Sequence, residues 1–425
     1  MRMKDSGIEW IGKIPQEWEY IRAKHIFAQS TEKGNTVLEL LSATQNNGVV
    51  PKTTLEGVVQ VSEDADLTTF KTVHKGDYVI SLRSFQGGFE MSNYEGVITP
   101  AYTVFRAKTP INNQYFKMLF KCDGFISKMN SLTVGIREGK NIMFSDFADS
   151  YIPFPPLNEQ QRIADFLDRK CTQIDKTIEK EQQVIEKIKA YKQAIITEAV
   201  TKGLNPNVPM KESGIDFLGN IPKHWIVSRF SFETWVRARL GWKGLKAQEY
   251  VEDGYIFLST PNIKEAEIDF INVNYINEER YQESPEIKLS VGDVLLAKDG
   301  STLGTVNVVR YLPKEATVNS SIAIITPNNR LNGIYLMYLI KSDYIQTIIQ
   351  TMKDGMGVPH LFQRDINKMH ITVPPIEEQE QIALYLDRKC TKIDHFIKKK
   401  QMLIDKLSDY KKSLIYEAVT GKLEI

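Results

Sequence analysis

The most regular feature of the sequence is a stripe of mostly apolar residues that recurs in steps of four and three between Leu167 and Ala199. This spacing places the side chains along one face of an α-helix and is typical of a coiled-coil seam. A second stripe, between Leu386 and Ala418, repeats the spacing and admits polar residues at the same two layers. The stripes therefore predict two matching coiled-coil helices. Their seam residues are Leu167, Ile174, Ile178, Ile185, Ile188, Ile195, Leu386, Ile393, Ile397, Ile404, Leu407 and Leu414.

Each stripe predicts a helix of about 45 residues, which is about 65 Å long at 1.5 Å per residue. For the first helix, Pro156 followed by Asn158 as the N-cap is a start signal, and Gly203 is a stop signal. One stripe alone would favour a helix that faces an ordinary core, but two matched copies favour a helix pair. A short linker separates the first helix from the second half of the chain. We therefore expect antiparallel helices with a domain at each end, and a C-terminus that returns beside the first domain.

The chain is an internal repeat. The segment MKDSGIEWIGKIPQEW, which begins at Met3, returns at Met210 as MKESGIDFLGNIPKHW, and the helix block from Pro155 returns at Pro374 with about half of its residues identical. A repeat of this kind indicates two copies of one structural plan. The predicted segments are a conserved segment with the first domain (1–155), the first helix (156–204), a linker, conserved segment and second domain (205–374), and the second helix (375–425).

The two middle stretches, residues 18–154 and 225–373, differ strongly in sequence but share a skeleton. Both KGDYVISLRSFQGG and VGDVLLAKDGSTLG combine a turn, a β-run and a glycine-containing polar loop. A further β-run and one short amphipathic helix follow in each, QYFKMLFKCDGFISKMN in the first and IYLMYLIKSDYIQTIIQTM in the second. The fold class predicted is α+β, with two globular mixed α/β domains on one scaffold. Constant ends around variable middles suggest two specificities.

Composition narrows the function by exclusion. The 425 residues are 42% hydrophobic and 25% charged with a net charge of +1, which is typical of a soluble globular protein and neither favours nor excludes nucleic acid. No apolar run suits a membrane span or a signal peptide, so we expect a cytoplasmic protein. The cysteines and histidines show no metal-binding spacing, and the glycine loops match no phosphate-binding motif. We therefore predict no catalytic, cofactor or metal site on this chain.

These motifs resemble the specificity (S, HsdS) subunits of type I restriction-modification enzymes over nearly the whole chain. The resemblance rests on GIEWIGKIPQEW and GIDFLGNIPKHW, on the helix openings PPLNEQQRIADFLDRK and PPIEEQEQIALYLDRK, and on the endings EAVTKG and EAVTGK. It implies two target recognition domains related by a pseudo-twofold axis, each reading half of a split double-stranded DNA site, with the antiparallel coiled coil setting the gap. It also implies two methyltransferase (M) subunits, and restriction (R) subunits bound through them, as partners that carry S-adenosylmethionine, ATP and Mg.

Polar residues at loop tips are the candidates for base contacts, because their side chains can make bidentate hydrogen bonds to base edges. Each could instead be a solvated loop residue or a phosphate contact, which positions the protein without specifying sequence. The candidates in the first domain are Thr44, Gln45, Asn46, Arg83, Ser84, Gln86, Arg137, Lys140 and Asn141. Those in the second domain are Thr260, Asn262, Lys298, Asp299, Ser301, Thr302, His360, Gln363 and Arg364.

Two other functions remain open from the residues alone. An enzyme that carries its own nuclease or methyltransferase would need a further catalytic domain, and the repeats leave no unassigned stretch of sufficient length. A coiled-coil adaptor with two protein-binding domains explains the helices but not two divergent domains on one scaffold. The lysine-rich stretch 391–412 is interpreted as a solvated helix face rather than a DNA-binding track.

Overall fold

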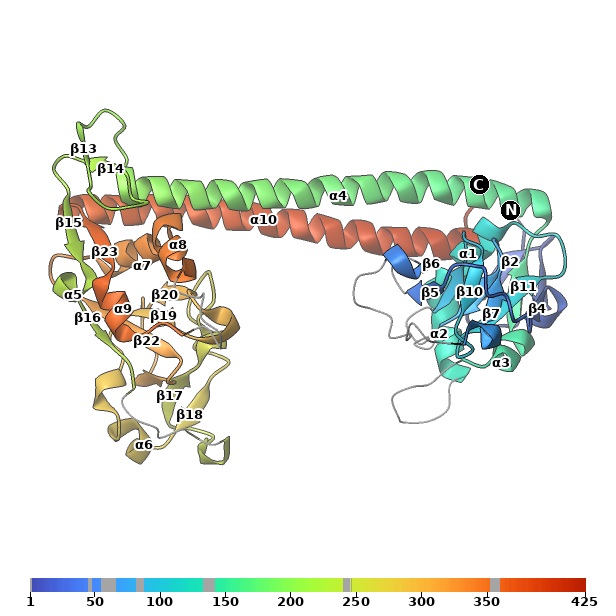
Figure 1. Cartoon of the computed structure of the whole chain (residues 1–425), viewed down its shortest axis with the longest axis horizontal. Helices are drawn as coiled ribbons and strands as arrows, with labels where there is room; N and C mark the ends of the chain where they lie inside the picture. Colours follow the sequence, from blue (N-terminus) through green and yellow to red (C-terminus); the bar gives the residue numbers. More distant parts are fainter. Residues whose placement is uncertain are drawn as a thin grey trace. The chain divides into compact units, whose positions relative to one another are not determined.

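The computed structural model describes residues 2–44, 48–54, 66–81, 88–132, 142–239, 245, 247–351 and 360–425. The chain divides into two compact units, unit 1 (Met1–Glu181 with Met402–Ile425) and unit 2 (Gln182–Gln401). Each unit contains a mixed domain and one end of both long helices (Figure 1). The helices are therefore shared between the units rather than forming a segment of their own.

Unit 1 begins with a short hairpin and continues into a mixed domain. Its described strands are β1 (Met3–Asp5), β2 (Lys13–Pro15), β3 (Glu19–Arg22), β4 (Phe27–Gln29), β5 (Leu41–Thr44), β6 (Gly48–Pro51), β7 (Lys71–Val73), β8 (Tyr78–Ile80), β9 (Phe89–Met91), β10 (Gly96–Ile98), β11 (Thr103–Ala107) and β12 (Tyr151–Phe154). Its short helices are α1 (Asn113–Lys121), α2 (Asp123–Leu132) and α3 (Phe144–Asp149).

Unit 2 repeats this order. Its described strands are β13 (Met210–Glu212), β14 (Asn220–Pro222), β15 (Ile226–Arg229), β16 (Thr234–Arg237), β17 (Tyr255–Leu258), β18 (Asn274–Ile276), β19 (Val294–Ala297), β20 (Val306–Val308), β21 (Ala316–Val318), β22 (Ile322–Pro327) and β23 (His370–Val373). Its short helices are α5 (Phe230–Glu233), α6 (Glu278–Gln282), α7 (Gly333–Lys341), α8 (Asp343–Thr351) and α9 (Gln363–Lys368).

Each unit is built on an antiparallel four-stranded sheet with the same strand order. The order is β4-β11-β8-β9 in unit 1 and β16-β22-β19-β20 in unit 2. The central strands β8 and β19 are buried at every residue, which explains their uninterrupted apolar sequences. In unit 2, α7 packs on this sheet on the side of the long helices (Figure 1). The shared skeleton expected from the sequence is confirmed.

The cores of the two sheets are filled differently. In unit 1 a cluster of aromatic rings surrounds Phe27, whose centroid lies 5.5 Å from that of Phe105 and 5.7 Å from that of Phe120. The corresponding core of unit 2 is mainly aliphatic and includes Leu296 and Ile325. The apolar character of the core is thus retained while the side chains change, as cores commonly tolerate.

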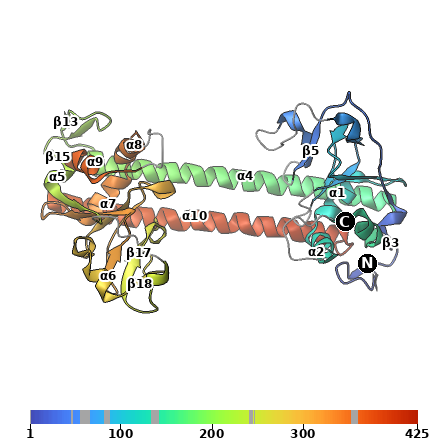
Figure 2. The ribbon, with the colours of Figure 1, turned by 60° about the horizontal axis from the view of Figure 1, so that its bottom comes forward.

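The long helices are α4 (Leu157–Lys202, 46 residues) and α10 (Ile376–Val419, 44 residues). Because α4 runs from unit 1 into unit 2 and α10 runs the other way, the two helices are antiparallel within each unit (Figure 2). Lys411 of α10 donates to Asp175 at 2.6 Å in unit 1, and Lys192 of α4 donates to Asp394 at 2.7 Å in unit 2. Within the described part of the chain, no helix carries an apolar stretch that would span a bilayer.

The predicted N-cap of the first helix was wrong. Helix α4 begins at Leu157, so Asn158 lies inside the first turn instead of before it. The residue that fixes the start of the helix is Gln160, which is 1% exposed. Its amide oxygen accepts from the backbone N–H of Asn112 at 2.9 Å, and its amide nitrogen donates to the carbonyl of Pro155 at 2.9 Å. The start is therefore held by tertiary contacts, which a local sequence signal does not contain.

The single amphipathic helix predicted in each domain is two helices. Helix α1 ends before Cys122 and α7 ends before Ser342, and both residues have extended backbones with ψ of 144° and 151°. The chain turns there, and Asp123 or Asp343 begins the next helix. The sequence predicted one helix because both helices face the same core, so the apolar periodicity continues through the break.

The conserved segments close over the ends of the long helices. Trp18 donates its indole N–H to Glu159 in unit 1, and Trp225 donates to Glu378 at 3.0 Å in unit 2. At the C-terminal end of the chain, the Tyr416 hydroxyl donates to the Trp10 carbonyl at 3.0 Å. The C-terminus therefore lies beside the first domain, as expected.

Candidate nucleic-acid interface

One edge of unit 2 gathers the loops that follow three strands. Strands β17 and β21 are parallel, so their C-terminal ends share an edge. The backbone N–H of Asn319 donates to the carbonyl of Leu258 at 2.8 Å, and the N–H of Lys298 donates to the carbonyl of Ser321 at 2.9 Å. The loops after β17, β19 and β21 therefore meet on one rigid support, which is a common way to place recognition residues.

A loop from much later in the sequence joins this edge. The backbone N–H of Leu361 donates to the carbonyl of Lys298 at 2.7 Å, and His360 and Asp299 form an isolated antiparallel bridge. The Nδ1 atom of His360 lies 3.7 Å from the Asp299 carboxylate. Two sets of sequence-predicted residues are thus brought together. We call the surface formed by Lys298, Asp299, Ser301, Thr302, His360, Phe362, Gln363 and Arg364 the unit 2 recognition edge.

The recognition edge contains an exposed aromatic ring beside two basic side chains. Phe362 is 49% exposed. The His360 ring centroid lies 4.5 Å from the Phe362 ring centroid, and the Arg364 guanidinium lies 4.9 Å from the same Phe362 centroid. Arginine can donate two hydrogen bonds to guanine, and an apolar side chain can contact the thymine methyl group. Phe362 was not among the residues predicted from the sequence, although an aromatic residue close to the candidates His360 and Gln363 is a usable signal.

Lys298 lies half-buried at the base of the recognition edge. Partial burial lowers the pKa of its ammonium group, while the neighbouring Asp299 carboxylate opposes this shift. Among the described residues no carboxylate lies within ion-pair distance of Lys298. A cation that has lost solvent without gaining an ion pair favours the approach of an anion such as a phosphate.

The remaining predicted residues of this edge differ in exposure. Ser301 is exposed, while Thr302 and Gln363 are half-buried. Gly300, with a φ of +70°, makes the turn that carries Ser301 outward. The edge therefore presents hydroxyl, amide, cationic and aromatic groups over a few residues.

Thr260 and Asn262 lie in the loop after β17 and serve different roles. Thr260 is half-buried, whereas Asn262 is 6% exposed. The Asn262 amide oxygen accepts from the backbone N–H of Ser259 at 2.9 Å, and its amide nitrogen donates to the carbonyl of Asn272 at 2.7 Å. This side chain orders the loop and has little surface left for a base edge.

In unit 1 only one predicted residue falls within the described structure. Thr44 ends β5, and its hydroxyl donates to the carbonyl of Gly48 at 3.1 Å. A parallel bridge joins Leu40 to Val97 of β10, which matches the pairing of β17 with β21 in unit 2. Thr44 thus corresponds in position to the loop after β17. The residues outside the described structure are Gln45, Asn46, Arg83, Ser84, Gln86, Arg137, Lys140 and Asn141.

Comparison with known proteins decides the family. The model of the type I restriction modification DNA specificity domain matches residues 15–190 and 247–403. The chain belongs to this family. The two matched stretches cover most of both mixed domains and much of both long helices.

Relatives agree with this assignment, and a solved structure shares the fold. The MjaVIII type I specificity subunit of Methanocaldococcus jannaschii is 24% identical over 283 residues, which are 66% of this chain and 63% of that protein. The putative MjaX specificity subunit of the same organism is 23% identical over 98% of this chain and 96% of its own length. A chain solved in work on complex assembly and conformational transition of the type I restriction-modification system has a TM-score of 0.74 at 15% identity, covering 96% of this chain and 99% of that one.

In this specificity-family chain, the predicted seam residues of the long helices are buried or half-buried. Lys192 and Lys411, at polar layers of the seam, reach aspartates of the opposite helix. The buried positions are Leu167, Ile174, Ile185, Leu386, Ile404 and Leu414. The half-buried positions are Ile178, Ile188, Ile195, Ile393, Ile397 and Leu407.

The described residues of this family member contain no group of three or more histidine, cysteine, aspartate or glutamate side chains placed to hold a metal ion. The three cysteines are buried free thiols. Burial raises the pKa of the Cys122 thiol to about 12, so it stays protonated at neutral pH. It behaves as a core residue.

Proposed function

We propose that the chain is a DNA specificity subunit in which each unit reads one half of a bipartite, asymmetric site and which performs no catalysis itself. The observation that carries this proposal is the repeated scaffold. Both units have the same four-stranded sheet order, the same parallel strand pairing and the same closure over the long helices, while the sequences of their candidate loops differ. Two recognition domains that share a scaffold but differ in their candidate contact residues fit a DNA site whose two halves differ in sequence.

The chemistry of the unit 2 recognition edge supports DNA as the ligand. Lys298 supplies a cation that suits a phosphate, while the Arg364 side chain is 75% exposed, with its Nε atom 3.8 Å from the Asp365 carboxylate, and presents its guanidinium to a base. Phe362 adds an exposed apolar face beside Arg364. Phosphate contacts position a protein on the duplex, and base contacts specify the sequence. The edge holds both kinds of group.

We further propose that the long helices set the gap between the two half-sites. Helices of 46 and 44 residues correspond to about 65 to 70 Å at 1.5 Å per residue. This length is close to two turns of B-DNA at about 34 to 36 Å per turn, so half-sites on one face of the duplex would be accessible. The gap is therefore expected to stay constant when the recognition residues change.

The partners in this proposal are two methyltransferase subunits and, through them, restriction subunits, acting on double-stranded DNA in the cytoplasm. S-adenosylmethionine, ATP and Mg belong to those partners. The specificity subunit contributes sequence choice, and the partners contribute the chemistry.

DNA binding by the complex with the cognate methyltransferase tests the proposal. Arg364→Ala is expected to weaken binding by about 1 to 3 kcal/mol at its target base pair and to relax specificity in one half-site only. Lys314→Ala removes a cation of unit 2 whose side chain is 46% exposed and pairs with Asp253 at 2.7 Å, and it serves as the control with unchanged sequence preference. Affinity should fall steeply with salt. Weak binding that does not depend on salt would contradict the proposal and favour an adaptor.

A further inference from the structure

Two lysines hold equivalent positions in the two units but have different partners. Lys121 is the last residue of α1, which packs on β9, and Lys341 is the last residue of α7, which packs on β20. In unit 1, Lys121 donates to the carboxylate of Glu90 on β9, and Glu90 is 4% exposed. The buried acid and the lysine therefore neutralise each other, as buried charges require.

Unit 2 has an amide at the position of this acid. Asn307 corresponds to Glu90, because each is the middle residue of the last strand in the same four-stranded order. The Asn307 amide nitrogen donates to the carbonyl of Lys264 at 2.8 Å, so it serves the backbone instead of a lysine. Lys341 therefore has the position of Lys121 without the acid that accompanies it in unit 1.

The surroundings of Lys341 favour an anion. Lys341 is half-buried and donates to the backbone carbonyl of Glu265 at 3.0 Å, and no carboxylate of the described residues lies within ion-pair distance of it. Burial lowers the pKa of Lys341 to about 8, and the neighbouring cations of Lys192 and Arg310 act in the same direction. The Glu265 carboxylate and the Cys390 thiol oppose this shift. At about pH 7 the ammonium group is still mainly charged, so an oxyanion beside it would be stabilised.

Lys341 borders a hollow of about 800 Å³, and all the residues that line this hollow belong to unit 2. The other cations of the lining are in ion pairs, which are Lys189 with Glu186, Lys192 with Asp394 and Glu265, and Arg310 with Asp387. Within the described lining, the charge left without a carboxylate is that of Lys341. Val306 and Met337 add apolar surface, and a mixed lining of this size suits an organic ligand that carries an anionic group.

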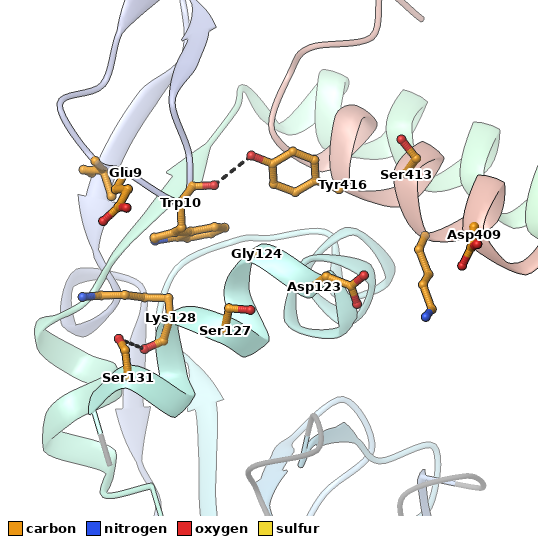
Figure 3. A pocket seen from close by; sticks show the side chains of 12 residues that line it. Glu9, Trp10, Asp123, Gly124, Ser127, Lys128, Ser131, Asp409, Ser413 and Tyr416 are labelled. Carbon is orange, nitrogen blue, oxygen red and sulfur yellow. Dashed lines mark hydrogen bonds between the residues drawn. The ribbon is translucent and has the colours of Figure 1, made fainter. Parts of the chain in front are cut away.

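A hollow of similar volume in unit 1, about 790 Å³, has the opposite balance of charge. Figure 3 shows that it is lined by the hairpin that carries Trp10, by α2 and by α10. The charged residues of its lining are the acids Glu9, Asp123 and Asp409 and the lysines Lys128 and Lys412. Because the acids outnumber the lysines, this hollow would repel a phosphate. The volume of a hollow alone therefore does not single out the one beside Lys341, and its unpaired cation does.

We propose that the hollow beside Lys341 binds the phosphate group of a small phosphorylated molecule. A lysine ammonium group is a compact point charge that suits phosphate. The apolar side chains of the hollow would contact the rest of the molecule. The site shares no residue with the unit 2 recognition edge, so the inference goes beyond the proposed function and does not depend on it. A phosphate of the DNA backbone offers the same chemistry, and the experiments below distinguish the two sources.

The first experiment measures the melting temperature of the full chain at about pH 7 while phosphate replaces chloride at constant ionic strength. Wild type should be stabilised in a saturable way, with a Kd on the order of 1 mM, whereas the general effect of an excluded salt does not saturate. Lys341→Met should weaken phosphate binding at least about tenfold. Without phosphate this variant should melt no lower than wild type, because the Glu265 carbonyl also accepts from the Asn307 amide at 3.3 Å. Adenosine monophosphate, the organic probe, should bind at least as tightly as inorganic phosphate.

The equivalent lysine of unit 1 provides the matched control. Lys121→Met removes the ion pair of the buried Glu90, so it should lower the melting temperature by roughly 5 °C or more. Its response to phosphate should equal that of wild type. An equal response of wild type and Lys341→Met to phosphate would overturn the inference. So would a loss of stability in Lys341→Met as large as that in Lys121→Met, because Lys341 would then be a structural residue.

DNA binding by the complex with the cognate methyltransferase distinguishes the two sources of phosphate. If a free molecule is the ligand, the complex with Lys341→Met should bind DNA with the salt dependence of wild type. A slope of log K against log salt that is smaller by about 0.9 in Lys341→Met would assign the charge to a backbone phosphate and overturn the small-molecule ligand. The melting experiment contains neither DNA nor methyltransferase, so its result stands whether or not the proposed function fails.

Discussion

At the scale of single residues, both units pair a buried aspartate with an arginine and a hydroxyl, but the arginine and the hydroxyl come from exchanged positions. In unit 1, Asp77 accepts from Arg106 of β11 at 2.9 Å, and the same guanidinium donates to the hydroxyl of Ser30 at 3.2 Å. The aspartate precedes the central strand β8 and is 4% exposed. A buried carboxylate needs such partners, because burial without pairing is costly.

Unit 2 keeps the aspartate but takes the arginine from another strand. Asp293 accepts from Arg237 of β16 at 2.8 Å, and Arg237 also donates to the hydroxyl of Thr326 on β22. In unit 1 the hydroxyl comes from Ser30, directly after β4, and the arginine comes from β11. In unit 2 the arginine comes from β16, which occupies the place of β4, and the hydroxyl comes from β22, which occupies the place of β11. The pairing is retained while its members change places.

This exchange predicts how unit 2 responds to substitution. Arg237→Ala leaves Asp293 unpaired with a side chain 0% exposed, which should cost about 3 to 5 kcal/mol of unfolding free energy. The paired exchange Arg237→Ser with Thr326→Arg reproduces the arrangement of unit 1 and should recover part of the loss. Urea unfolding measures both variants. A cost below about 1 kcal/mol for Arg237→Ala would show that the pair contributes little.

A histidine of unit 1 predicts a pH dependence of stability. The hydrogen bond to Glu32, and a weaker one to Glu95, raise the pKa of His74, and the same contact lowers the pKa of Glu32. A raised histidine pKa stabilises the fold below its unfolded value of about 6.5 and loses this effect as the pH rises through the folded pKa. The lowered Glu32 pKa adds stability above its own unfolded value of about 4.3.

The pair should therefore contribute most between about pH 5 and pH 6.5, and by at most about 1 kcal/mol because both groups are substantially exposed. Thermal melting of wild type and His74→Gln at several pH values measures it. The difference in melting temperature should be larger at about pH 6 than at about pH 9. An equal difference at both pH values would contradict the assigned ion pair.

At the scale of elements, long-range periodicity was predictable and local boundaries were not. The two coiled-coil helices and their antiparallel course followed from the seam spacing and the chain order. The breaks at Cys122 and Ser342 could not be predicted in this way, because the two helices on either side of each break face one core and their apolar pattern continues through it. The start of α4 depends on Gln160 contacting a distant loop, which local cap signals do not reveal.

The closure of the leading hairpin over the end of α10 gives a prediction with a matched control. Gly421 has a φ of +70°, and a Cβ added there would clash with Cδ of Pro15. Gly219 has a φ of +67° but nothing within 4 Å of an added Cβ. Gly421→Ala should therefore cost about 2 to 4 kcal/mol, the sum of backbone strain and overpacking, whereas Gly219→Ala should cost about 1 kcal/mol. Equal melting temperatures for the two variants would contradict the tight closure.

At the scale of the whole molecule, the repeat in the sequence predicted the plan, and the candidate recognition site was predicted only as a set of loops. Lys298 and His360 were both candidates, but their contact through a backbone bridge comes from strand order that the sequence does not display. Asn262 was a candidate because amides read adenine, yet its amide is used within its own loop. Phe362 was missed because polar residues alone were considered.

The central claim is that each unit reads one half of a split site, and methylome sequencing tests it most directly. Cells would express this chain with its cognate methyltransferase subunit, alongside a version whose residues 225–373 come from a relative of different specificity. The account predicts an asymmetric motif with a fixed gap that depends on the chain, with only one half altered by the exchange. A motif whose two halves both change, or no chain-dependent motif while the methyltransferase is active, would contradict it.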